Sequence, residues 1–254
     1  LGLAAGAAIY ARGGNVQFFG PVSITARGFL RVASGGIIQA DSDVVLKAPY
    51  IAVGQIFRPP FNPVENLENP YFPFQRFENG TIAQELVQPV FGTGHLSLSA
   101  DVIDVGTLAL KDIGSASFTA AGGDIRGNGT LSIAGDLILK AAQIYPTTYS
   151  AFNIFAYDHG GIPGSVTIAR AGRAATPLSA AGSLNIFASV INQGGVLLAP
   201  FGSITLGWDG TDLDPSTPAL DGPISPTAGA GTTPIASKVT LQDGSLTSVA
   251  GVDY

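Results

Sequence analysis

A short motif of alternating apolar residues returns along this chain, each time bounded by glycine. One copy runs from Gly94 to Gly106, a second from Gly129 to Ala141, and the clearest from Leu184 to Gly207. Inside each copy the apolar residues alternate with Ser, Thr, Asn or Lys, the period of strands with one buried face. Self-similarity of this kind marks a repeat architecture, in which each unit buries its apolar face against its neighbours. The chain is therefore expected to fold as a rod of stacked β units.

The pattern predicts an all-β fold, a parallel β-helix or β-solenoid, over a single unit of residues 1–254. The apolar runs are about three to five residues long, which is short for a sandwich. Ala, Ser and Gly recur where coils about 4.8 Å apart would turn a corner. An antiparallel sandwich or barrel is the alternative fold. The residues expected to point inward in ladders are Leu96, Leu98, Leu131, Ile133, Leu137, Leu139, Leu184, Ile186, Leu198, Ile204 and Leu206.

Two segments interrupt the repeat. Residues 55–92 are rich in Pro, Phe, Asn and Glu, and residues 208–237 in Pro, Gly, Thr and Ala. Loops longer than about 15 residues are usually functional or disordered. Both segments are therefore expected to leave the rod as loops, the first packing its aromatic rings on the rod's flank. The remaining residues would make about nine coils of about 20 residues each, a rod of about 40 Å.

Composition excludes several classes of function. The 254 residues carry a net charge of −6 and only 12% charged residues, so a nucleic-acid partner, whose phosphates need basic residues, is not expected. There is no cysteine for disulfides or thiolate metal sites, and no cofactor is predicted. No apolar run reaches the roughly 18 residues that span a bilayer. Because the chain starts and ends within the repeat pattern, we expect a segment of a longer protein.

The run from Gly194 to Gly207 reads GGVLLAPFGSITLG. It resembles the shaft of the filamentous-haemagglutinin family of large exoproteins, which often carry Gly, an apolar pair, Ala-Pro, Gly, Ile and Leu-Gly in this order. Residues 94–106, 177–184 and 240–250 resemble the same shaft, and the likeness covers most of residues 94–254. The Asn-Pro-rich motifs of the family's secretion domain are not found, so the resemblance is to shaft alone.

The resemblance implies a right-handed parallel β-helix in a bacterial protein that is secreted across the outer membrane by a partner transporter. It also implies a role as adhesin or fibre at the cell surface. The partners would be flanking coils of the same long chain or copies of itself, host or surface glycans or proteins, and the transporter during secretion.

Metal-binding patterns are sparse. His95 and His159 are the only histidines and have no second ligand nearby in sequence, so no zinc site is predicted. Asp209, Asp212 and Asp214 cluster in a loop, where calcium finds hard oxygen ligands. Their spacing fits neither an EF-hand nor the nonapeptide calcium repeat, and a solvated acidic turn is the stronger interpretation.

No catalytic residue is assigned, and the chain is not expected to be an enzyme. The carboxylate pairs Asp41/Asp43 and Asp101/Asp104 raise the alternative of a polysaccharide-degrading β-helix enzyme, which needs two carboxyl groups facing one groove. Such groups come from adjacent coils, and one sequence does not show that register. A subunit that polymerises end to end is a third alternative.

Aromatic side chains of the first excursion are the best candidates for contact with a partner or a glycan. Exposed rings stack on sugars or dock another chain, although the same rings would also serve to cover the rod. The set is Phe57, Phe61, Tyr71, Phe72, Phe74 and Phe77, joined by Trp208. The sequence thus favours a structural segment of a secreted fibrous protein that acts in adhesion or extracellular assembly, with recognition in the excursions.

Overall fold

The computed structural model describes residues 37–54, 88–211, 214–215 and 233–251, and the backbone of seven short strands outside these ranges. The described residues form strands and turns and contain no helix, so none is present there that could cross a membrane. This agrees with the predicted all-β fold. The strands are β1 (Gly2–Leu3), β2 (Ile9–Tyr10), β3 (Val16–Phe18), β4 (Val22–Ala26), β5 (Phe29–Ala33), β6 (Ile37–Ala40), β7 (Asp43–Lys47), β8 (Tyr50–Val53), β9 (Gln75–Glu78), β10 (Thr81–Gln84), β11 (Val90–Ala100), β12 (Val102–Val105), β13 (Leu108–Ala120), β14 (Asp124–Gly127), β15 (Gly129–Ala134), β16 (Asp136–Ala141), β17 (Gln143–Pro146), β18 (Ala151–Tyr157), β19 (Ser165–Arg170), β20 (Ser183–Ala188), β21 (Val190–Gly194), β22 (Val196–Leu198), β23 (Ser203–Leu206), β24 (Lys238–Leu241) and β25 (Leu246–Ser248).

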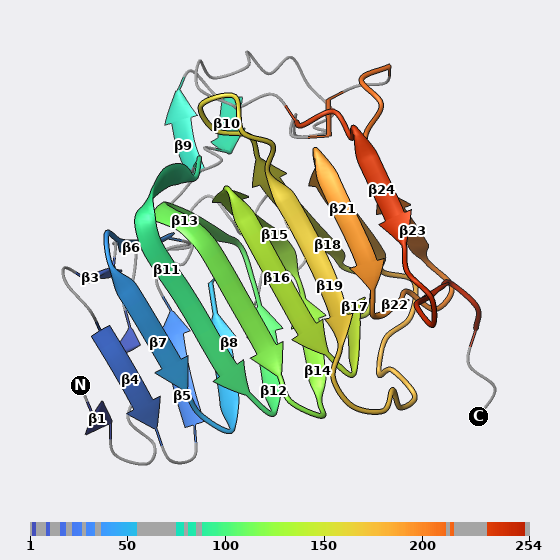
Figure 1. Ribbon diagram of the computed structural model, residues 1–254, viewed down its shortest axis with the longest axis horizontal. Coiled ribbons are helices and arrows are strands. Elements are labelled where there is room, and N and C mark those ends of the chain that lie inside the picture. The colour runs from blue at the N-terminus through green and yellow to red at the C-terminus, as the bar shows by residue number, and fades with distance from the viewer. Residues whose placement is uncertain are drawn as a thin grey trace.

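The strands lie in three rows, and one passage of the chain around all three is called a circuit (Figure 1). Row one holds β3, β6, the first part of β13, β15, β18, β20 and β23. Row two holds β1, β4, β7, β11, the second part of β13, β16, β19, β21 and β24. Row three holds β2, β5, β8, β12, β14, β17, β22 and β25. Every pairing within the rows is parallel, as predicted, and among the described strands the hairpin β9–β10 is the one antiparallel pair.

Strands β11 and β13 are longer than the predicted three to five residues, with 11 and 13 residues. Strand β13 is long because it continues around the corner from row one to row two, where it pairs with β15 at Leu108 and with β16 at Ser115. Strand β11 starts at the same corner, where Val90 pairs with Lys111, and continues along row two. Glycine lines this corner. A Cβ on Gly114 would lie 2.4 Å from the carbonyl oxygen of Gly92, and one on Gly135 would lie 2.1 Å from that of Gly114. Neighbouring circuits therefore approach too closely here for any side chain, which explains the small residues expected at corners.

Alternation along each strand sends one face inward. In β16 the burial alternates residue by residue from Asp136, exposed, to Ala141, buried. The inward residues of row two stack in register, circuit upon circuit, and form one ladder of Leu46, Leu98, Phe118, Leu139 and Ile168. Eight of the predicted core residues are buried, namely Leu96, Leu98, Leu131, Ile133, Leu137, Leu139, Leu184 and Ile186.

Three predicted core residues are not fully buried. In β22 the inward residue is Leu197, which pairs with Ile144, so the prediction for Leu198 was one residue out of register. Ile204 and Leu206 lie on β23, the last strand of row one, where no further described strand covers them; both are partly buried against the core.

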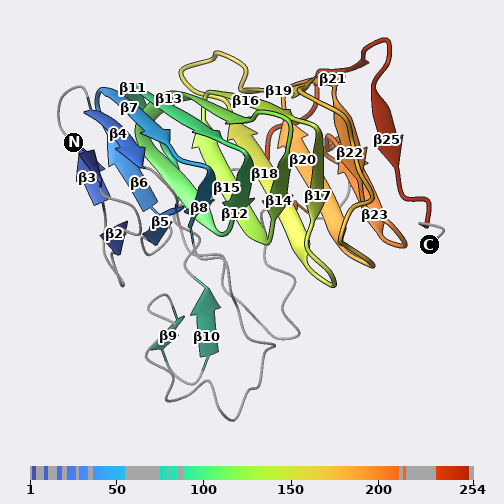
Figure 2. The ribbon, with the colours of Figure 1, turned by 90° about the horizontal axis from the view of Figure 1, so that it is seen from below.

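Among the described residues, two circuits lack a strand in one row. Row one has no described strand between β6 and β13, which pair directly, Leu110 with Ile38; in the sequence, residues 55–89 separate β8 from β11. The predicted boundary at residue 92 falls inside β11, which begins at Val90. The second case was not predicted: residues 171–182 contain no strand, and β17 pairs across them with β22. In both places row two keeps its strand, so the ladder through the stack is unbroken (Figure 2).

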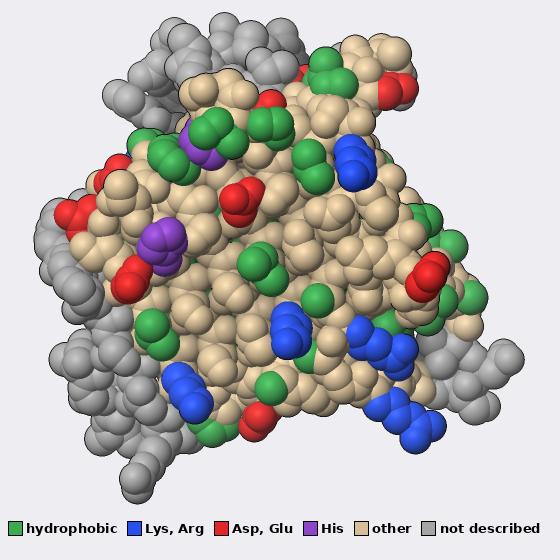
Figure 3. Space-filling model, in the orientation of Figure 1, with side chains coloured by type: hydrophobic (Ala, Val, Ile, Leu, Met, Phe, Trp, Pro, Cys, Tyr) green, Lys and Arg blue, Asp and Glu red, His purple; other side chains and the backbone are tan. Residues whose placement is uncertain are grey.

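The outer face of row two is polar and nearly flat. One line of outward residues runs Ser97, Ser117, Ile138 and Thr167 on successive circuits, so three of the four carry a hydroxyl group. Figure 3 looks onto this face, where basic side chains gather toward the lower edge. Two aliphatic side chains, Val45 and Ile138, are exposed on it.

Candidate functional site

Charged side chains from successive circuits converge on the outer face of row three. The inward residues Ile51, Ile103, Ile125 and Ile144 are buried at equivalent positions of β8, β12, β14 and β17. The residues next to each of these isoleucines in its strand point outward, because side chains alternate along a strand. The register then sets Asp104 beside Arg126, and Asp124 beside Gln143.

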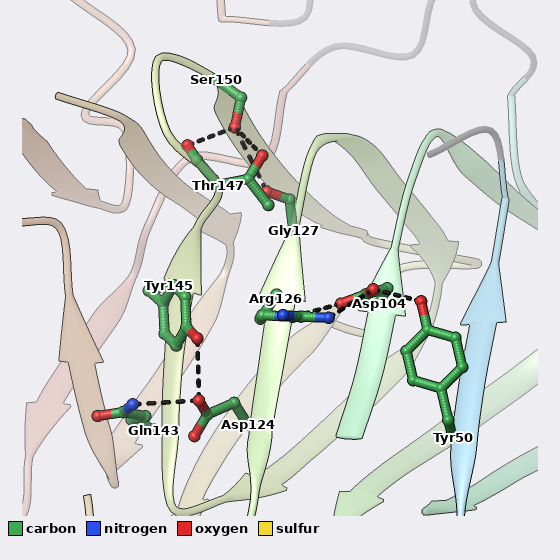
Figure 4. Close-up of polar contacts among 9 residues, drawn as sticks. All are labelled: Tyr50, Asp104, Asp124, Arg126, Gly127, Gln143, Tyr145, Thr147 and Ser150. Atoms are coloured by element: carbon green, nitrogen blue, oxygen red, sulfur yellow. Dashed lines mark hydrogen bonds and ion pairs between the residues drawn. The ribbon is translucent and has the colours of Figure 1, made fainter. Parts of the chain in front are cut away.

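Asp104 binds donors from the circuits on both sides (Figure 4). Arg126 donates from Nε to Oδ1 at 2.6 Å and from Nη2 to Oδ2 at 2.8 Å, while the hydroxyl of Tyr50 also donates to Oδ2. The pair is half-buried, with 33% of the Arg126 side chain and 13% of the Asp104 side chain exposed. Hydrogen bonding to Asp104 raises the pKa of the Arg126 guanidinium above its ordinary value. The result is a bidentate ion pair, the strongest geometry that these two groups adopt.

Asp124 is held in the same way one step along the face. The Tyr145 hydroxyl donates to its Oδ2 at 2.9 Å and the Gln143 amide at 3.2 Å. Burial, and then the hydrogen bond to Asp124, raise the pKa of Tyr145 well above its ordinary value. Gln143 is fully buried, and its Oε1 has no hydrogen-bond partner among the described residues. Beyond Tyr145, Ser150 donates to the carbonyl of Thr147 at 2.8 Å and closes the turn that follows β17.

This network ties circuits together. Asp104 receives three hydrogen bonds and Asp124 two, all from side chains of neighbouring strands. A catalytic carboxyl group must reach the proton or the atom it acts on, whereas these two carboxyl groups are occupied by protein donors. The arrangement therefore acts as a lateral clamp between β8, β12, β14 and β17.

We expect Asp104→Asn and Arg126→Gln to be coupled in a double-mutant cycle by about 1 kcal/mol of unfolding free energy. The value is kept low because a third of Arg126 is exposed, where solvent screens the pair. Urea unfolding of the wild type, both single variants and the double variant measures the coupling, which should shrink in 1 M salt. Lys140→Gln, on the exposed side of β16, is the control and should change stability by less than about 0.5 kcal/mol. A coupling near zero would show that the clamp contributes nothing.

Asp104 was singled out from the sequence, but its predicted partner Asp101 lies at an exposed corner and is not part of this network. The two histidines have separate neighbours: His95 Nδ1 lies 2.6 Å from Ser115 Oγ, and the His159 ring stacks on Phe91 at 3.7 Å between centroids. Among the described residues no group of three His, Cys, Asp or Glu side chains could hold a metal ion.

The calcium candidates are described only in part, because Asp212 lies outside the described residues. Thr211 donates to Asp209 Oδ1 from its backbone at 3.0 Å and from its hydroxyl at 2.7 Å, and these bonds lower the pKa of Asp209. Asp214 accepts hydrogen bonds from the backbone and the hydroxyl of the buried Thr233. The Asp209 carboxylate thus closes a local turn, whereas Asp214 contacts a residue 19 positions away. Calcium binding stays the weaker interpretation of this loop, beside that of a solvated acidic turn.

The predicted aromatic contacts Phe57, Phe61, Tyr71, Phe72 and Phe74 lie outside the described residues, and only the backbone of Phe77 is described, in β9. Trp208 is half-buried, and its carbonyl accepts a hydrogen bond from Ala236 at 2.8 Å. The two ends of the second excursion therefore meet at the rod.

A different aromatic cluster covers the outer face of row one. Phe155 packs against Phe187 at 5.0 Å and Tyr157 at 5.6 Å between centroids, and both phenylalanines are buried. Beside them Asn185 donates to Asn153 Oδ1 at 2.8 Å. Burial, and then the charge of Asp214, raise the pKa of Tyr157, so residue 214 of the second excursion lies near this cluster. The sequence carried the signal: the tetrapeptide NIFA occurs at 153–156 and again at 185–188.

No protein-family model matches this chain, and neither does any curated protein or solved structure. The resemblance of residues 94–254 to exoprotein shafts therefore stays a prediction from the sequence.

Proposed function

We propose that this chain is a structural segment of a secreted, cell-surface fibrous protein of bacteria, and that it acts in adhesion or extracellular assembly. Its strands would form a right-handed parallel β-helix that supplies length and stiffness. Its partners would be further coils of the same chain or copies of itself, with a transporter in the outer membrane during secretion.

One observation carries the proposal: row two is a continuous parallel ladder from β1 to β24, even where row one or row three has no described strand. In such a stack each circuit contacts only its neighbours, so the fold extends in one dimension. The clamp at Asp104 and the Asn153–Asn185 contact also run between circuits, along the same direction. Polar groups on the surface are thus used to stiffen the stack.

The right hand follows from a general rule. A connection that joins two parallel strands of one sheet is right-handed in about 98% of cases, because a twisted strand returns to its sheet favourably only that way. Each circuit here makes such a connection, for instance from β16 through β17 and β18 to β19.

The location is tested on cells that make the protein. Antibodies raised against the purified chain should label filaments on intact cells by electron microscopy, and external protease should remove the label. Label confined to the interior of permeabilised cells would overturn the proposal.

The adhesive role is tested by deletion. Removing residues 58–90 and joining the ends by a short turn should keep the far-UV circular dichroism of the rod and abolish attachment to host cells. Removing residues 216–232 is the matched control for loss of an excursion. Attachment that survives the first deletion would contradict the assignment of the aromatic segment.

A polysaccharide-degrading enzyme is the alternative, and the convergence of Asp104, Arg126 and Asp124 on adjacent strands is the observation that favours it. Release of reducing ends from polygalacturonate by the intact chain, lost in Asp124→Asn, would establish this alternative. We expect no release, since both carboxylates are bound by protein donors.

A further inference from the structure

The corner between row three and row one repeats one unusual turn in three consecutive circuits. Tyr149, Ala181 and Phe201 occupy the same place in these turns. The amide of Tyr149 donates to the carbonyl of Ala180 at 3.0 Å, and the amide of Ala181 donates to that of Pro200 at 2.8 Å. Figure 2 shows the turns after β17 and β22 on the same side of the stack.

All three residues have a left-handed backbone, with φ of 53° at Tyr149, 54° at Ala181 and 57° at Phe201. This conformation costs a residue with a Cβ roughly 1–2 kcal/mol, and glycine adopts it freely. A bulky side chain there is rare, and such outliers gather at functional sites. Glycine would therefore be the most stable residue at this position, yet two of the three turns carry an aromatic residue there.

The two aromatic side chains point into solvent. Tyr149 is 84% exposed and Phe201 69% exposed. The ring of Phe201 rests on the backbone of Gly251, where a Cβ would come within 2.3 Å of the ring. The ring is thus supported beneath and open above.

Spacing follows from the stack. Tyr149 and Phe201 are two circuits apart, or about 10 Å along the axis of the rod. Ala181, in the circuit between them, has only a methyl group, so the middle turn carries no ring. The two exposed rings, Tyr149 and Phe201, are together called the platform below.

The segments that form these turns carry no charge. Residues 146–150, 178–183, 199–203 and 248–251 include no charged side chain. Hydroxyl groups lie beside the rings, and Thr148 and Ser203 are exposed. These turn segments offer no basic side chain to a polyanion, whereas exposed rings and hydroxyl groups suit a neutral ligand with apolar faces and hydroxyl edges.

We propose that this corner binds an extended, neutral β-1,4-linked polysaccharide that lies along the rod. One sugar unit of such a chain is about as long as one circuit is thick. Alternate rings, which face the same way, would then stack on Tyr149 and Phe201, while Thr148 and Ser203 reach the hydroxyl edges. The site is distinct from the aromatic excursion, and it stands apart from the proposed structural role, because a rod without it would still be a rod.

The test separates binding from folding. Tyr149→Gly and Phe201→Gly should each weaken binding of cellohexaose or chitohexaose to the full 254-residue chain by about tenfold or more. The same variants should unfold at the same or a higher urea concentration, because glycine relieves the left-handed backbone. Ala181→Gly is the matched control: it makes the same backbone change in the middle turn and should leave binding unchanged.

Three results would overturn the proposal. The intact chain binds neither oligosaccharide in isothermal titration; the two glycine variants bind as well as the wild type; or polygalacturonate binds more tightly than the neutral chains. The immunolabelling of cells described above is independent of all three, so failure here is distinguishable from failure of the structural role.

Discussion

Leu137→Ala is expected to lower the free energy of unfolding by about 2–5 kcal/mol, and Ile138→Ala, at the next residue, by less than about 0.5 kcal/mol. Leu137 is fully buried in the ladder between Ala116 and Val166, whereas Ile138 is 45% exposed on the outer face of row two. Truncation at the buried position loses apolar contacts and leaves a cavity between two circuits that cannot collapse. Urea unfolding followed by circular dichroism measures both changes.

The comparison uses two aliphatic residues of equal size in one strand. Strand propensity favours the β-branched Ile138, so a larger loss at Leu137 reports burial. Equal losses for the two variants would mean that the two faces of β16 are equally buried. Reversed losses would place the strand one residue out of register, since a slip of one residue exchanges its faces.

Gly127→Ala is expected to cost about 1–3 kcal/mol, and the loss should depend on Phe152. Gly127 faces inward from row three, and a Cβ there would lie 1.9 Å from the ring of the fully buried Phe152 in row one. The ring occupies the space that the missing side chain leaves, so the two residues fill one section of the core together. Phe152→Ala alone should cost about 3–5 kcal/mol.

The double variant should lose at least about 1 kcal/mol less than the sum of the two single losses, because the added methyl group then enters the cavity. Phe118→Ala is the matched control: Phe118 is equally buried, but the nearest atoms to a Cβ at Gly127 all belong to Phe152. Gly127→Ala and Phe118→Ala should therefore be additive. Additivity in the Phe152 cycle would show that the core rearranges to accommodate the methyl group.

Alternation in the sequence predicts which way a side chain points within a strand, and this explains the success at Leu137 and Ile186. It does not predict how circuits align with one another. The contact between Asp104 and Arg126 joins residues 22 positions apart, and that between Gln193 and Thr247 joins residues 54 apart. Both depend on the exact number of residues in each circuit.

The core residue Gln193 shows the same limit. It lies at an inward position between Ile168 and Leu241, where the alternation calls for an apolar side chain. Its amide is fully buried, and hydrogen bonds to Gly195, Leu246 and Thr247 at the turn into row three replace those it would make with water. Only the fold brings these groups together, so no local pattern marks the residue as satisfied.

The segment 171–182 was missed for a related reason. Its Pro177 and Ser179 are buried, and Ser179 donates to the carbonyl of Pro146 at 2.5 Å. In sequence it reads like one more turn of the repeat, with small residues and a proline. Its length of 12 residues is too short to stand out as an excursion, yet long enough to replace a strand.

The two circuits that lack a strand give the rod a shape. Between β6 and β13, row one has one strand fewer than row two, and between β17 and β22, row three has one fewer. Each missing strand shortens one side of the stack by about 4.8 Å while the opposite side keeps its full length. The rows on opposite sides of the stack therefore differ in length at two places, with row one shorter at the first and row three shorter at the second. In a fibre built of such segments, the positions of the insertions would set where the rows differ in length.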